Sequence, residues 1–79
     1  MANAPKSLPT SRELAYVQAI GAAAKRLGLT QAALAARAGI SQPQVSRILS
    51  GERPVTLNEL LDLLDAVGLD LADVARDVG

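Results

Sequence analysis

The side chains best suited to chemistry follow Ser41, and they are hydrogen-bonding groups rather than nucleophiles or acids. If a helix begins there and buries Val45 and Ile48, a rotation of about 100° per residue turns the polar residues outward. A glutamine amide can pair with adenine and an arginine with guanine in the DNA major groove, and a proline ring can contact a thymine methyl. The candidates for recognising bases are therefore Gln42, Pro43, Gln44, Ser46 and Arg47. An ordinary solvated helix face is the alternative interpretation.

A second set of polar residues stands where helix ends could bind DNA phosphates. Amide groups at a helix start carry a partial positive charge and lack acceptors within the helix. The expected phosphate-binding residues lie at two predicted helix starts and in the turn that follows the helix beginning at Ser41: Thr30, Gln31, Ser41, Ser50 and Arg53. Thr30 and Ser41 are equally expected as plain helix caps, and capping does not exclude contact with a phosphate.

Residues 31–50 have the pattern of two short helices joined by a tight turn. Ala35 is small in the middle of the first helix, where a larger side chain would push the second helix away. Gly39 can adopt the positive φ that a sharp turn requires. Val45 and Ile48 have the spacing that directs them back onto the first helix. The pattern predicts a helix-turn-helix unit.

Three further helices are expected around this unit. Thr10 with Glu13, and Thr56 with Glu59, have the spacing of capping boxes. The predicted helices run from Thr10 to about Leu27, from Gln31 to about Arg37, from Ser41 to Ser50, from Thr56 to Gly68 and onward from Asp70. Because there is no strand pattern, the fold class is all-α, a compact bundle of five helices. It would form one domain over residues 10–79, preceded by a flexible arm at 1–9.

The composition excludes several classes of function. The 79 residues suffice for one small domain, and they include no histidine and no cysteine. Without these residues, a glycine-rich phosphate loop or an evident carboxylate pair, we expect no enzyme, no metal site and no cofactor. No segment resembles a membrane span or a leader, so a cytoplasmic location is expected, at the nucleoid when DNA is bound.

The charges are segregated along the chain although they sum to zero. Residues 1–53 carry seven basic and two acidic side chains, whereas residues 54–79 carry one basic and six acidic ones. Phosphate binding depends on the local potential more than on the total charge, so the first part remains suited to DNA. The alternative is that acidic and basic helices simply pair within the domain.

These features resemble the lambda-repressor and Cro-like helix-turn-helix family, often called the Xre family, over about residues 14–74. The matching segments are LTQ at 29–31, LA at 34–35, AGISQ at 38–42, VSRI at 45–48, SG at 50–51 and the leucine-rich helix of 57–68. The resemblance implies a five-helix fold. It also implies that Gln31, Ser50 and Arg53 contact phosphates and that the bases are contacted by Gln42, Pro43, Ser46 and Arg47. Family members often carry an arginine and an acidic residue where this chain has Ala24 and Leu49. Since both charges are missing together, we expect apolar packing there instead.

The resemblance also implies a function. Such domains commonly act as transcriptional repressors that bind a two-fold symmetric operator on double-stranded DNA as dimers, with the third helix in the major groove. The alternative is the antitoxin of a toxin–antitoxin pair, which binds a toxin protein and represses its own operon. A homodimer would use the fourth and fifth helices, whose apolar surplus either forms the contact or closes the monomer's core: Leu63, Val67, Leu69 and Val78.

Overall fold

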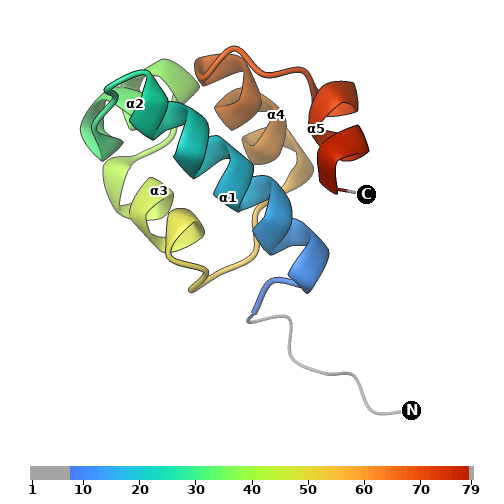
Figure 1. Ribbon diagram of the computed structural model, residues 1–79. Helices are drawn as coiled ribbons and strands as arrows, with labels where there is room; N and C mark the ends of the chain where they lie inside the picture. Colours follow the sequence, from blue (N-terminus) through green and yellow to red (C-terminus); the bar gives the residue numbers. More distant parts are fainter. Residues whose placement is uncertain (1–7, 79) are drawn as a thin grey trace.

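The computed structural model describes residues 8–78 and folds them into five α-helices (Figure 1). The helices are α1 (Ser11–Arg26), α2 (Gln31–Ala38), α3 (Gln42–Leu49), α4 (Leu57–Ala66) and α5 (Leu71–Val78). No strand occurs between residues 8 and 78, and the predicted all-α fold is confirmed. Most of the expected arm, residues 1–7, and the terminal Gly79 lie outside the described residues.

Side-chain caps determine where the helices begin. The Thr10 hydroxyl accepts the amide of Glu13 at 3.1 Å, and Glu13 Oε1 accepts the amide of Thr10 at 3.0 Å. Thr56 and Glu59 repeat this capping box at the start of α4, with distances of 3.2 and 3.0 Å. Asp70 accepts an amide hydrogen from the first turn of α5. The predicted helix starts hold because each cap satisfies amides that the helix itself leaves without acceptors.

The core forms where α1 meets the other helices. Figure 1 shows α1 crossing the molecule, with α2 and α3 on one side of it and α5 on the other. Helix α1 contacts α3, α4 and α5, while α2 contacts α3 and α4. Alanines at the contacts allow these short helices to approach closely. The largest fully buried side chains are Ile20, Leu34, Val45, Ile48, Leu63 and Leu64.

Two of the four residues considered for a dimer contact belong to this core. Leu63 is fully buried and Val67 is buried, so neither is available to a second molecule. Leu69 and Val78 are half-buried and pack against the core. For Leu63 and Val67 the alternative of closing the monomer's core is therefore correct, because a domain this small needs most of its large aliphatic side chains internally.

No helix between residues 8 and 78 combines the length and apolar character that crossing a membrane requires.

Candidate nucleic-acid interface

The α2–turn–α3 unit holds one face of α3 away from the core. Gly39 ends α2 with φ 72°, and its amide donates to Ala35 O at 2.9 Å. Ala35 is buried, as are Val45 and Ile48 on the inner side of α3. The small side chain of Ala35 permits close packing of the two helices, and the left-handed glycine permits the turn. The geometry is that of the predicted helix-turn-helix.

The candidate base-recognising residues occupy the outer side of α3. Gln42, Pro43 and Arg47 are exposed, and Gln44 and Ser46 are half-buried. Pro43 stands in the first turn, where the lack of an amide hydrogen costs no intrahelical bond. The helix thus presents amide, hydroxyl and guanidinium groups on an exposed surface that carries no acidic side chain between residues 42 and 49.

Thr30 and Ser41 are helix caps, and both remain exposed. Thr30 Oγ1 accepts the amide of Ala33 at 3.0 Å, and Ser41 Oγ accepts the amide of Gln44 at 3.3 Å. Gln31 is exposed at the first position of α2, where its own amide has no acceptor within the helix. The start of α2 therefore retains amide donors toward solvent, whereas α3 retains fewer because Pro43 has none.

The hydroxyl of Ser50 already has partners within the chain. Ser50 Oγ lies 3.1 Å from Arg47 O and 3.0 Å from Glu52 Oε2. The Glu52 carboxylate therefore lies directly beside a residue that the sequence suggested for phosphate binding. A phosphate at Ser50 would have to displace this carboxylate.

Arg53 is the most extensively bonded side chain near the interface. Its Nε donates to Gln44 Oε1 at 2.7 Å, and its Nη1 donates to Pro54 O at 2.7 Å. Its Nη1 and Nη2 also donate to the two carboxylate oxygens of Glu59, at 3.1 and 2.7 Å. The arginine thus joins α3 to the start of α4. Sequence analysis missed this cluster, because nothing in the spacing of residues 44, 53 and 59 signals it.

The pair of Arg53 and Glu59 is partly shielded from water, with side-chain exposures of 26% and 23%. Hydrogen bonding from Arg53 lowers the pKa of Glu59, and the amide of Thr56 acts in the same direction. The same hydrogen bonds, which Arg53 donates to the Glu59 carboxylate, raise the pKa of Arg53. Burial opposes both shifts and is outweighed. At neutral pH the pair is therefore fully ionised and the cluster intact.

A shallow hollow of about 270 Å³ lies between α1, α2 and α3. Lys25, Thr30 and Gln31 line it together with Ala24 and Leu49. Ala24 is buried in the core, and Leu49 packs against that core. Apolar side chains packed in or against the core therefore stand at both positions, in line with the apolar packing expected there.

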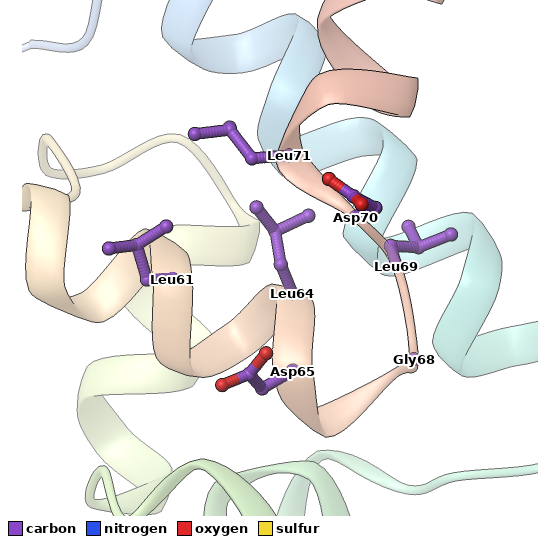
Figure 2. A pocket seen from close by; sticks show the side chains of 7 residues that line it. All are labelled: Leu61, Leu64, Asp65, Gly68, Leu69, Asp70 and Leu71. Carbon is purple, nitrogen blue, oxygen red and sulfur yellow. The ribbon is translucent and has the colours of Figure 1, made fainter.

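The opposite part of the molecule has a different character. A groove of about 540 Å³ lies between α4 and the start of α5. Figure 2 shows Leu61, Leu64 and Leu71 around this space, with the carboxylates of Asp65 and Asp70 beside them. Leu61 is 38% exposed, and Leu57, one turn earlier on α4, is 66% exposed. This surface combines apolar and acidic groups, unlike the outer side of α3.

Comparison with known proteins identifies one family and several similar folds. The family described as "Helix-turn-helix domain" matches residues 11–76. The crystal structure of the wild-type restriction-modification controller protein C.Esp1396I has a TM-score of 0.79 at 16% identity, covering 87% of this chain and 90% of that chain. The controller protein C.AhdI from Aeromonas hydrophila has a TM-score of 0.72 at 23% identity, with coverages of 82% and 98%. The clp gene regulator ClgR from C. glutamicum has a TM-score of 0.74 at 27% identity, with coverages of 89% and 90%. No curated protein matches the sequence at a significant level.

Proposed function

The chain belongs to the helix-turn-helix domain family, and from this premise we propose that it is a transcriptional regulator that binds double-stranded DNA sequence-specifically. The observation that carries the proposal is the exposed outer side of α3, held by a close α2–α3 contact and populated by residues able to hydrogen-bond to bases. The similar folds include a gene regulator and two controller proteins of restriction-modification, which supports the same function here.

In this proposal α3 is the recognition helix and lies in the major groove. The base contacts come from the outer side of that helix: Gln42, Pro43, Gln44, Ser46 and Arg47. Phosphates of the flanking DNA backbone accept hydrogen bonds from two helix starts. The donors lie at Thr30 and Gln31 at the start of α2, and at Ser41 at the start of α3. Ser50 joins them by exchanging its hydrogen bond to the Glu52 carboxylate for one to a phosphate oxygen. Arg53 is engaged inside the chain, so we assign it no phosphate.

The distribution of charge on the surface also supports an orientation in which α3 faces the DNA. The acidic residues Asp62, Asp65, Asp73 and Asp77 are all exposed on α4 and α5, whereas the basic residues Lys25, Arg26, Arg37 and Arg47 are exposed on α1, α2 and α3. DNA repels the first group and attracts the second, so the recognition helix would approach first. A regulator of this kind would act in the cytoplasm, on the nucleoid.

We further propose that the regulator is a repressor that acts as a homodimer through α4 and α5. A single domain of this size makes few base contacts, and two copies on a two-fold symmetric operator would double them. The exposed Leu57 and Leu61 offer an apolar surface for the contact, beside the groove that ends at Leu71. The two recognition helices would then occupy major grooves about 10 base pairs apart.

The same groove favours a second candidate, an antitoxin that binds a toxin protein and represses its own operon. The combination of leucines with Asp65 and Asp70 would suit a small basic partner. Purification of the chain from its native host distinguishes the two candidates. A stoichiometric basic protein in the eluate supports the antitoxin, whereas the chain alone or with DNA supports a free regulator.

Selection of bound sites from a random pool of double-stranded DNA tests the proposed function. We expect a consensus sequence with two-fold symmetry and half-sites about 10 base pairs apart. The affinity for that consensus should fall steeply as salt rises, because bound phosphates release counterions. Failure to enrich any sequence, with equal binding to all pools, would refute the proposal.

A further inference from the structure

Arg53 connects the recognition helix to the rest of the domain through a single side chain. Its guanidinium donates to Gln44 on α3, to the carbonyl of Pro54 and to Glu59 on α4. A guanidinium has five N–H donors, and these bonds use four of them. Little of its hydrogen-bonding capacity therefore remains for DNA.

The contact fixes which way the amide of Gln44 points. A guanidinium carries only donors, so the atom that faces Arg53 Nε at 2.7 Å must be the amide oxygen of Gln44. The amide nitrogen, with its two N–H donors, is consequently turned away from Arg53. Gln44 is half-buried near the start of α3, so its side chain has limited freedom to turn otherwise.

We propose that Arg53 is a positioning residue for base recognition, holding Gln44 as a hydrogen-bond donor toward an acceptor edge such as guanine O6 and N7. This inference rests on the proposed function, since it concerns how α3 distinguishes bases. The inference also narrows which base Gln44 can recognise. Recognition of adenine uses the amide oxygen and the amide nitrogen of a glutamine together, and the bond to Arg53 competes for that oxygen. Glu59 contributes by holding Arg53 through both carboxylate oxygens.

A phosphate-binding role for Arg53 makes a different prediction. An arginine that neutralises a phosphate contributes about 0.9 to the slope of log affinity against log salt. The charge of Arg53 is already balanced by Glu59, so its removal should leave this slope unchanged. The salt dependence therefore separates the two roles.

The experiment compares the full chain with the variants Arg53→Met, Gln44→Ala and the double variant, each titrated on the selected operator and on operators altered at one base pair at a time. In Arg53→Met the discrimination at the base pair recognised by Gln44 should fall by about fivefold or more. The same change in the Gln44→Ala background should have no further effect, because Arg53 acts through Gln44. Arg76→Met on α5 serves as the control for loss of one positive charge.

Gln44→Glu provides a second variant that should preserve the fold. It retains an oxygen for Arg53 but replaces the amide donors with an acceptor, so the preference at that base pair should shift toward cytosine or adenine. An unchanged preference at the base pair recognised by Gln44, in either Arg53→Met or Gln44→Glu, would overturn the inference. A uniform loss of affinity for all operators together with a reduced salt slope in Arg53→Met would also overturn it. If the wild-type chain selects no sequence, the proposed function itself fails, which is a separate outcome.

Discussion

Glu13 and Glu59 close equivalent capping boxes, and both also bind the segment that follows α3. Glu13 uses Oε1 for the amide of Thr10 and Oε2 for the amide of Val55, at 3.0 and 3.4 Å. Glu59 uses Oε1 for the amide of Thr56 at 3.0 Å and both oxygens for Arg53. Two helix caps therefore also anchor residues 53–55, and through them the end of α3.

The Glu59 carboxylate should make stability depend on pH in the acid range. Its bond from Arg53 lowers its pKa in the folded state below the ordinary value of 4.5. A carboxyl group with a lowered folded-state pKa stabilises the fold above its unfolded-state pKa, and this contribution is lost as pH falls through the folded-state value. We therefore expect the free energy of unfolding to decrease as pH is lowered from about 5.

Urea unfolding at a series of pH values measures this effect. The variant Glu59→Gln should be less stable than the wild type at pH 7 and should lose less stability on acidification. Asp62→Asn, at an exposed position on the same helix, is the control for removal of one negative charge. Parallel curves for Glu59→Gln and the wild type would show that the ion pair does not contribute.

Arg47 should contribute strongly to affinity for the selected operator. It is exposed on the outer side of α3, and an arginine bound to guanine through two hydrogen bonds discriminates by about 1–3 kcal/mol. Arg47→Ala should weaken operator binding by this amount and relax specificity at one position of each half-site. Arg76→Ala removes the same group from an exposed position on α5 and should leave affinity nearly unchanged. Equal affinities of Arg47→Ala and the wild type would remove Arg47 from the base contacts.

Ala35 should tolerate no enlargement, because it is buried where α2 packs on α3. Ala35→Leu should destabilise the fold by about 1–3 kcal/mol through overpacking and should weaken DNA binding by displacing the recognition helix. Ala36→Leu is the matched control, since it adds the same atoms at the next, exposed position. Urea unfolding and operator titration measure the two effects, and equal stabilities of the two variants would contradict the close contact.

The parts of the fold that follow from local rules could be predicted from the sequence. A cap needs only a hydroxyl and an acidic residue three positions later, so Thr10, Thr56 and their glutamates marked the helix starts. The turn at Gly39 followed from the special conformational freedom of glycine. These signals depend on neighbours in the chain and not on tertiary packing.

The hydrogen bonds of Arg53 could not be predicted, because they depend on tertiary packing and not on neighbours in the chain. Its bonds to Gln44 and Glu59 depend on how α3 and α4 meet, and many exposed arginines in such a turn would face solvent instead. Likewise, the spacing of leucines on α4 indicated an apolar side, but not how much of the helix surface the core would cover. Leu63 and Val67 could therefore have been either core residues or dimer-contact residues.

Leu61 should determine whether the chain forms a dimer. It is 38% exposed on α4 beside the groove that leads to α5, and a contact there would bury it in both copies. Leu61→Asp should therefore yield a monomer in light scattering at micromolar concentration and weaken binding to the two-fold operator by about tenfold or more. Because the side chain is not part of the buried core, the free energy of unfolding of the monomer should change little. Leu27→Asp is the control, as Leu27 is 55% exposed beyond the end of α1 and far in sequence from both helices. A Leu61→Asp protein that remains dimeric, or a Leu27→Asp protein that becomes monomeric, would place the contact on another surface.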